Sequence, residues 1–360
     1  MKTPIVLIAF NRPQHTARTL EAIKQANPER LLVVLDGARA ERPDDTGKCA
    51  EVRALIDAID WTEVSVRAAD ENLGCEGNVE TGLDWAFNQV TEAIVLEDDC
   101  VPDPSFFKYA EELLTRYRDN TKVWQIAGNS HGVPSALFGE DSYRFSSWAS
   151  VWGWATWADR WQRHREVFPR THIGRSGIVP IRTAPYTPQA GALVTKSARN
   201  HFEEASTSGD VITHGWDKQW WITMLSEGGL AVSPAVNLVE NVGFGADATH
   251  GVVEREMDPA HAMTFPMHHP TNVAVDTEVE RELELLLNRV GGRAARVARK
   301  LVRSPRARRV LRRMADSKTA VRASRAASRL RDRGTPTSTP PANTPSASTP
   351  PASTPPANDR

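Results

Sequence analysis

The sequence has no long apolar run and few cysteines, and both absences exclude classes of protein. No window reaches about 18 consecutive apolar residues, the length that a bilayer-spanning helix needs, so we expect no transmembrane span. The three cysteines, Cys49, Cys75 and Cys100, form neither a CxxC pair nor a metal-binding spacing. This pattern predicts no disulfide framework and no zinc site, and it is typical of a reducing compartment. We expect a cytoplasmic protein.

The sequence also lacks the glycine motifs that bind phosphate, and it lacks the pattern of a secretory leader. Neither a Walker A sequence nor GxGxxG occurs, which argues against a P-loop enzyme and against a dinucleotide cofactor. The chain enters an apolar segment at Ile5 without a long hydrophobic region or a small-residue cleavage site. We therefore expect no signal peptide.

The formal net charge of −1 conceals a strong asymmetry along the chain. Residues 289–333 hold 17 Lys and Arg against two acidic residues, whereas residues 1–288 hold 26 basic and 42 acidic residues. The basic arm is typical of segments that lie on anionic membranes, which would make the protein peripheral on the inner face of a membrane. A solvated arm without a partner is the alternative. Nucleic acid also attracts polycations, but the acidic remainder opposes it, so no nucleic acid is expected.

Apolar runs alternate with helical patterns in the first third of the chain. Residues 5–10, 31–35 and 93–96 are predicted as buried strands, and residues 16–25 and 79–90 as amphipathic helices. Strand–helix alternation with short connections predicts an α/β fold, a mostly parallel sheet flanked by helices.

Changes of composition predict where the domains end. Residues 1–275 are expected to form the globular domain, with halves 1–130 and 131–275. Residues 276–333 are helix-prone and rich in Arg and Ala, which predicts a basic helical arm. The segment 334–360, rich in Thr, Pro, Ala and Ser, cannot bury a core and is expected to be disordered.

The second half opens with a block of aromatic residues. Trp152, Trp154 and Trp157 lie within residues 143–161, which hold seven aromatic side chains. They are interpreted either as core residues that pack on the sheet, or as rings of which one or two stack on an acceptor sugar.

Three carboxylates follow directly on the predicted strand 93–96. Glu97, Asp98 and Asp99 would lie at the carboxyl end of this strand, where open α/β sheets bind ligands. Adjacent carboxylates repel one another, so the cluster is costly unless a cation or sugar hydroxyls meet it. The alternative is an acidic loop before the helix that starts near Ser105.

Other polar residues also fall at the ends of predicted elements. Arg12 follows the first strand, Asp36 follows the second, and His250 lies in a late glycine-bearing segment. An Arg pairs with phosphate, an Asp accepts from a base or ribose, and carboxylates with a His hold Mn²⁺ or Mg²⁺. Together these residues favour a site for a nucleoside diphosphate with a divalent cation, although each alone has a structural alternative such as a turn or a cap.

Several segments occur in an order that resembles one enzyme family. The matching segments are Ile8–Pro13, Leu35–Gly37, Val95–Phe107, Trp152–Trp157, Trp216–Asp217 and Gly243–His250. In this order they resemble the nucleotide-diphospho-sugar transferases of the GT-A type, and they are similar to bacterial family 2-like glycosyltransferases and to the N-acetylglucosaminyltransferase I family. The resemblance covers about two-thirds of the chain and implies a GT-A, Rossmann-like fold.

The resemblance implies roles on the donor side of the site. Asp99 would ligate the Mn²⁺ or Mg²⁺ that bridges the two phosphates of the donor, while Glu97 and Asp98 would hydrogen-bond the donor sugar or ribose. Asp36 would contact the base, which in this family suggests a UDP-sugar. Arg12 would lie near the base or the diphosphate.

The resemblance also implies a catalytic base and a late ligand. Asp217 would deprotonate the acceptor hydroxyl, and its tryptophan neighbours predict partly apolar surroundings. A helix-dipole carboxylate is the alternative for Asp217. His250 would touch the metal or the diphosphate, with Asp247 as a weaker candidate.

The implied activity is an inverting, metal-dependent glycosyl transfer. The transferred group would be a hexosyl or N-acetylhexosaminyl unit, and the acceptor a hydroxyl of a glycan or of a lipid-linked glycan. Residues 1–130 would bind the nucleotide, and residues 131–275 would supply the acceptor and catalytic half. The alternatives are a sugar-1-phosphate nucleotidyltransferase and a non-catalytic module that binds glycans or nucleotides.

Overall fold

The fold comes from a computed structural model that describes residues 1–167, 215–244 and 258–289. Met1–Val290 form one compact unit. His250, Asp247, most of the predicted basic arm and the predicted tail lie outside the described residues. In the part of the chain that is described, no helix is long and apolar enough to cross a bilayer.

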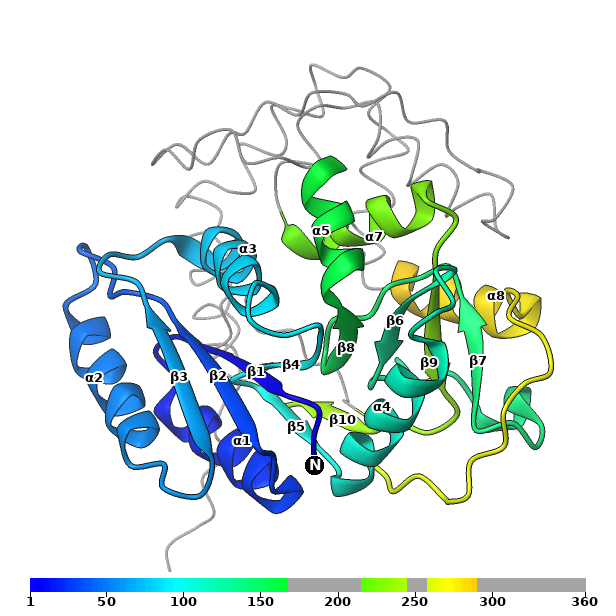
Figure 1. Ribbon diagram of the computed structural model, residues 1–360, viewed down its shortest axis with the longest axis horizontal. Helices are drawn as coiled ribbons and strands as arrows, with labels where there is room; N and C mark the ends of the chain where they lie inside the picture. The colour runs from blue at the N-terminus through cyan, green and yellow to red at the C-terminus, as the bar shows by residue number, and fades with distance from the viewer. Residues whose placement is uncertain (168–214, 245–257, 290–360) are drawn as a thin grey trace, which may run out of the picture. The chain divides into compact units, whose positions relative to one another are not determined.

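Within the described residues, eight strands form one sheet in the order β3-β2-β1-β4-β8-β6-β9-β7 (Figure 1). All of these strands run in the same direction except β8 and β7, which run the opposite way. The strands are β1 (Ile5–Ala9), β2 (Arg30–Leu35), β3 (Glu63–Ala68), β4 (Glu92–Glu97), β6 (Val123–Ala127), β7 (Tyr143–Ser146), β8 (Trp154–Trp157) and β9 (Leu230–Pro234). The predicted α/β fold with a mostly parallel sheet is confirmed.

Helices connect the strands, and a small second sheet lies beside the turn that carries Glu97, Asp98 and Asp99, which we call the acidic turn. The helices are α1 (Pro13–Ala26), α2 (Pro43–Asp57), α3 (Gly74–Phe87), α4 (Pro104–Tyr117), α5 (Ala158–Val167), α7 (Trp216–Ser226), α8 (Thr277–Arg289) and the 3-10 helix η1 (Ser135–Phe138). The second sheet pairs β5 (Cys100–Pro102) with β10 (Val239–Asn241) in antiparallel fashion. Proline begins α1, α2 and α4, where its missing N–H costs no helical hydrogen bond.

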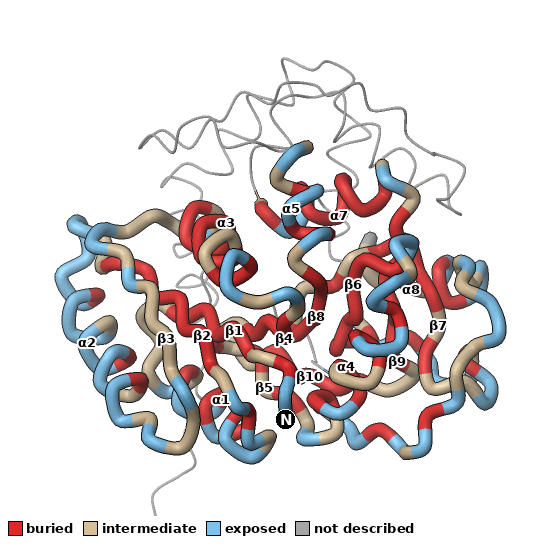
Figure 2. Tube along the Cα trace, viewed as in Figure 1, coloured by how far each residue is buried: buried red, intermediate tan, exposed pale blue. Residues whose placement is uncertain are grey.

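Both faces of the sheet are buried under helices. Along β4, Ile94 and Leu96 pack into one core with α1, α2 and α4, while Ala93 and Val95 pack into a second core with α3, α5 and α7. The central strands are accordingly buried along most of their length (Figure 2). A strand buried on both faces needs a continuous apolar sequence, which explains why β1, β2 and β4 show no alternation.

Helix α8 extends the second core beyond residue 275, where the globular domain was expected to end. Val279 and Leu283 are buried in the same cluster as α3 and α7. Two acidic residues of α8, Glu280 and Glu284, are also fully buried. This helix therefore packs on the sheet domain.

The predicted core alternative is confirmed for two of the three tryptophans. Trp154 and Trp157 lie on β8 and expose only 1% and 2% of their surface. Trp152, which precedes β8, is half-buried.

Candidate active site

The predicted site residues gather at the carboxyl edge of the parallel strands. In the sheet register, Ala9 at the end of β1 is level with Leu35 at the end of β2. Ile8 is level with Glu97 at the end of β4. Because these strands are parallel and end together, the residues that follow them meet at one edge, where this class of sheet binds ligands.

Arg12 binds the acidic turn directly. Its Nη1 donates to Oδ2 of Asp99 at 2.6 Å and lies 3.6 Å from Oδ1 of Asp98. The backbone N–H of Phe10 donates to Oδ2 of Asp98 at 3.2 Å. The segment after β1 thus supplies both a cation and a backbone donor to the carboxylates at the end of β4.

Buried hydrogen bonds hold the backbone of the acidic turn. The hydroxyl of Thr19 in α1 donates to the carbonyl oxygens of Asp98 and Cys100, at 2.9 and 3.2 Å. On the other side, the N–H of Val242 donates to the carbonyl oxygen of Asp99 at 2.8 Å. Elements from both halves of the chain therefore fix the turn in place.

Gly243 approaches Asp99 so closely that no side chain fits between them. A Cβ atom built on Gly243 would lie 2.8 Å from Cγ of Asp99 and closer still to its Oδ2. The N–H of Gly243 donates to Oδ1 of Asn241, at 2.8 Å, which fixes this approach. The described part of the glycine-bearing segment thus lies against the carboxylate of Asp99.

Burial and the neighbouring negative charges raise the pKa of two carboxylates, Glu97 and Asp98. Burial is the largest cause for Glu97, followed by the charges of Asp99 and Asp98, and its pKa is raised well above the ordinary value. For Asp98, burial and Asp99 raise the pKa to about 7, although Arg12 lowers it. Burial would lower the pKa of Arg12, but Asp98 and Asp99 outweigh this effect and raise it. The turn carries more negative charge than Arg12 neutralises.

Asp36 links the end of β2 to the loop before α3. Its Oδ1 accepts from the N–H groups of Gly37 and Leu73 at 2.9 and 2.8 Å, and its Oδ2 accepts from Nδ2 of Asn72 at 2.9 Å. Burial raises the pKa of Asp36, while these backbone donors lower it. The backbone of Gly74 also contributes a hydrogen bond that lowers this pKa, so Asp36 ties the end of β2 to the start of α3.

Asp217 lies in the first turn of α7, close to the end of β4. Its charge contributes to the raised pKa of Glu97 and to that of Cys75, so the three side chains share one region. The apolar surroundings expected for Asp217 are not found. Its side chain is exposed, because Trp216 and Trp220 on the same helix turn into the core. A base at this position is open to an acceptor.

Comparisons with known proteins add likenesses of fold. No family model matches the chain, and no curated protein matches it. It is similar to the mannosyltransferase PcManGT from Pyrobaculum calidifontis in complex with GDP-Man and Mn²⁺ (12% identity, 62% of this chain and 72% of that one, TM-score 0.34). It is also similar to UDP-glucose pyrophosphorylase complexed with UDP-glucose (13% identity, 49% of this chain and 82% of that one, TM-score 0.28). A third similar structure is the galactosyltransferase LgtC with donor and acceptor sugar analogues (13% identity, 45% of this chain and 60% of that one, TM-score 0.29). Because each TM-score is below 0.5, the fold assignment depends on this chain's own strand order.

Cys75 is a residue of this region that the sequence pattern did not single out. It lies in the first turn of α3, and its residue surface is exposed. Desolvation of the thiol, followed by the charges of Glu97 and Asp217, raises its pKa to about 12. The thiol therefore stays protonated at neutral pH, which argues against a role as a nucleophile. The sequence offered one reason to single out Cys75: it lies at the start of a predicted helix, directly after the segment Asn72–Gly74.

The acidic turn fits a divalent cation on its chemistry. Within the described ranges, no group of three or more His, Cys, Asp and Glu side chains is arranged to hold a metal ion. However, Mg²⁺ and Mn²⁺ commonly take one or two carboxylates from the protein and their other ligands from substrate phosphates and water. Asp99 would supply such a ligand, and a divalent charge would balance the two negative charges that Arg12 leaves when the turn is fully ionised.

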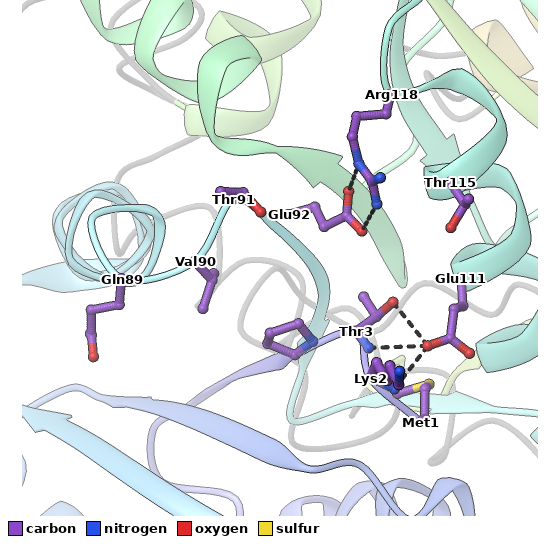
Figure 3. A pocket seen from close by; sticks show the side chains of 11 residues that line it. Met1, Lys2, Thr3, Gln89, Val90, Thr91, Glu92, Glu111, Thr115 and Arg118 are labelled. Atoms are coloured by element: carbon purple, nitrogen blue, oxygen red, sulfur yellow. Dashed lines mark hydrogen bonds and ion pairs between the residues drawn. The ribbon is translucent and has the colours of Figure 1, made fainter.

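A cavity of about 720 Å³ lies at the opposite, amino edge of the sheet (Figure 3). It is lined by the residues that precede β1 and β4 and by the last turns of α4. Three charged side chains in its wall have partners: Arg118 binds Glu92 at 2.8 Å, and Glu111 accepts from the N–H of Thr3 at 3.1 Å. This cavity is separate from the residues that the sequence marks as functional.

Proposed function

We propose that this chain is an inverting, metal-dependent glycosyltransferase. It would move a hexosyl or N-acetylhexosaminyl unit from a nucleoside diphosphate donor, with UDP as the expected nucleotide, to a hydroxyl of a glycan or lipid-linked glycan. The observation that carries the proposal is the arrangement of Arg12, the acidic turn and Asp217 around the carboxyl end of β4. This arrangement supports the proposal because it gathers a cation, three carboxylates and a further exposed carboxylate at one edge of the sheet.

The donor would lie along this edge with its base near Asp36 and its phosphates near Arg12 and Asp99. The bound metal would neutralise the charge that develops on the leaving nucleoside diphosphate. Arg12, which already pairs with Asp99, is close enough to share this charge with the phosphates. Glu97 and Asp98 would accept hydrogen bonds from hydroxyls of the donor sugar or ribose.

Asp217 would act as the base. Inversion in a single displacement requires that the acceptor hydroxyl attack the anomeric carbon from the side opposite the leaving phosphate. Asp217 lies in the first turn of α7, near enough for its charge to contribute to the raised pKa of Glu97, and its exposure leaves it accessible to an acceptor. It would take the proton of the attacking hydroxyl, for which it must come within roughly 2.6–3.2 Å.

The test is a screen of nucleotide sugars in the presence of Mn²⁺ or Mg²⁺, with calorimetric binding and donor hydrolysis as the two measurements. Asp99→Ala should abolish metal-dependent donor binding. Asp217→Asn should leave donor binding intact and lower donor hydrolysis, in which water takes the place of the acceptor, by about 10²–10⁴-fold, because it removes only the base. Asp57→Asn is the matched control, since Asp57 is an exposed carboxylate on α2 that pairs with Arg53. Donor hydrolysis at the wild-type rate by the Asp217→Asn variant would disprove the base assignment.

The same screen separates the alternatives. A sugar-1-phosphate nucleotidyltransferase would release pyrophosphate from a nucleoside triphosphate and a sugar-1-phosphate. A binding module would take up nucleotide or glycan without hydrolysing any donor. Either result in place of metal-dependent donor turnover would refute a glycosyltransferase.

The basic segment 289–333 belongs to the same proposal as a contact to anionic lipid. Its 17 basic residues would bring the acidic domain to a membrane that carries a lipid-linked acceptor. Flotation with phosphatidylglycerol vesicles would test this, comparing the full chain with a chain that ends at residue 288. Equal flotation of both chains would contradict it.

A further inference from the structure

A buried carboxylate, Asp45, joins the two loops that follow β1 and β2. It lies in the first turn of α2. Its Oδ1 accepts from Nδ2 of Asn11, in the loop after β1, at 2.7 Å. Nε and Nη2 of Arg39, in the loop after β2, donate to Oδ2 and Oδ1 of Asp45 at 2.5 and 3.0 Å. One side chain therefore connects two loops that come from neighbouring strands of the sheet (Figure 1).

The pairing with Arg39 keeps Asp45 ionised. A guanidinium that binds both oxygens of a carboxylate forms one of the stronger kinds of ion pair. The hydrogen bonds from Arg39, together with that from Asn11, outweigh burial and lower the pKa of Asp45 to about 2. Its neighbour Asp44 lies in the same helical turn but is exposed. Both carboxylates suit the amino end of a helix, so the contacts with Asn11 and Arg39, rather than the helix dipole, account for the burial of Asp45.

Asn11 belongs to the short segment that binds the acidic turn. The residue before it, Phe10, donates its N–H to Asp98 at 3.2 Å, and Nη1 of the residue after it, Arg12, donates to Asp99 at 2.6 Å. The side chain between them, that of Asn11, is the one bound by the buried carboxylate of α2. A shift of this side chain would move the backbone on both sides of it, and with that backbone the cation beside the acidic turn.

Arg39 makes a second link between the same two loops. Its guanidinium carbon lies 5.3 Å from the ring centroid of Phe10, within the range of a cation–π contact. The loop that carries Arg39 begins at Asp36, the residue proposed to contact the base of the donor. The loop that carries Phe10 leads to Arg12, which is proposed to contact the phosphates. The two loops thus supply opposite ends of the proposed nucleotide site, and Asp45 is bonded to both.

We propose that Asp45 is a positioning residue for the nucleoside diphosphate of the donor. This inference rests on the proposed function. Asp45 acts through Asn11 and Arg39, which fix the loop of Arg12 relative to the loop of Asp36. A ligand that contacts both loops binds more tightly when they are held in place beforehand, because less conformational freedom is lost on binding.

Asp45→Asn tests this role because it keeps the size of the side chain and removes its charge. Arg39 is partly exposed, so its guanidinium can turn to solvent and the fold should survive. Binding of UDP with Mn²⁺, measured by calorimetry on the full chain, should weaken about tenfold, as expected for the loss of a hydrogen bond to a charged group. Asp44→Asn is the matched control, since it removes the same charge from the same helical turn and should leave this affinity unchanged.

Mn²⁺ binding without nucleotide separates positioning from a purely structural role. A loosened Arg12 competes less well for Asp99, so Asp45→Asn should strengthen the binding of Mn²⁺ alone while it weakens the binding of UDP with Mn²⁺. Damage to the fold would weaken both. Asn11→Ala removes the 2.7 Å hydrogen bond and leaves the ion pair of Arg39 in place, and it should shift the two affinities in the same opposite directions. This second variant decides the question if Asp45→Asn does not fold.

The outcomes distinguish this inference from the proposed function. If the wild type binds neither UDP nor any other nucleoside diphosphate with Mn²⁺, the proposed function fails and this inference fails with it. If the wild type binds one of them, that nucleotide is used for the variants. The inference alone is then refuted when the folded variants bind the nucleotide as tightly as the wild type, or when their binding of Mn²⁺ alone does not become stronger.

Discussion

Replacement of Gly243 by alanine should damage the acidic turn while leaving the fold intact. The added Cβ would lie 2.8 Å from Cγ of Asp99, against 3.4–4 Å for ordinary contact, and closer still to Oδ2. The carboxylate therefore has to retreat by roughly 1 Å, and Oδ2 is the atom that accepts from Arg12 at 2.6 Å. The retreat involves the end of a half-buried side chain, so it costs about 0.5–1.5 kcal/mol of rotamer strain plus the weakened hydrogen bond.

The expected signature is a separation of activity from stability. A misplacement of about 1 Å at a reacting site can lower the rate about 100-fold, so kcat/KM for sugar transfer should fall by about that factor. The Tm should change by only a few degrees, since the strain is small beside the total stability. The control is Gly47→Ala, because a Cβ at this helical position meets nothing within 4 Å and should be neutral or stabilise α2 by about 0.5–1 kcal/mol. Wild-type activity in Gly243→Ala would refute the claim that the position of Asp99 controls the reaction.

Two further predictions concern charge. Arg12→Gln should strengthen Mn²⁺ binding in the absence of nucleotide by about tenfold, because it removes the guanidinium that competes for Asp99 through a charge-assisted hydrogen bond. Electron paramagnetic resonance of free Mn²⁺ measures this affinity. Weaker Mn²⁺ binding by the variant would show that Arg12 does not compete with the metal. Burial raises the pKa of Glu280 from 4.5 to about 7. Between these two values the folded state holds a proton that the unfolded state has lost. The free energy of unfolding should therefore decrease as the pH rises from 4.5 to about 7. Over that window the wild type should lose on the order of 3 kcal/mol more than Glu280→Gln in denaturant titrations, and parallel pH profiles of the two proteins would contradict the assignment.

The sequence predicted the first half of the sheet because local chemistry decides it there. Short apolar runs without alternation, bounded by turn residues, favour strands covered on both faces, and the polar residues after them lie at the ligand edge once the strands are parallel. Arg12 and Asp99 were therefore expected near one another, and the structure places them in hydrogen-bond contact. This contact does not test a role, so the roles of all the site residues stay predictions: Arg12, Asp36, Glu97, Asp98, Asp99, Asp217 and His250.

The second half was harder to predict because non-local pairing decides it. Nothing in the segment Trp152–Trp157 indicates that it enters the sheet in reverse between β4 and β6. The contact of Gly243 with Asp99 joins residues 144 positions apart, and a glycine in a loop has many local explanations. The exposure of Asp217 was also missed, since the direction of its tryptophan neighbours depends on how α7 packs.

The insertion of β8 has a consequence for how this protein can be dissected and how it folds. Strand β4 forms its ladder with β1 on one side and with β8, some 60 residues later, on the other. A fragment that ended at residue 130 would leave the buried strand β4 with an open apolar edge, a template for intermolecular pairing and aggregation. The ladder of β4 with β8 joins residues far apart in the sequence, so collapse of residues 1–130 alone cannot complete it. The pairing of β8 with β4 is therefore expected to be a slow step of folding. The two halves are thus one cooperative unit, and the acidic turn acquires its shape only when the last strands have joined.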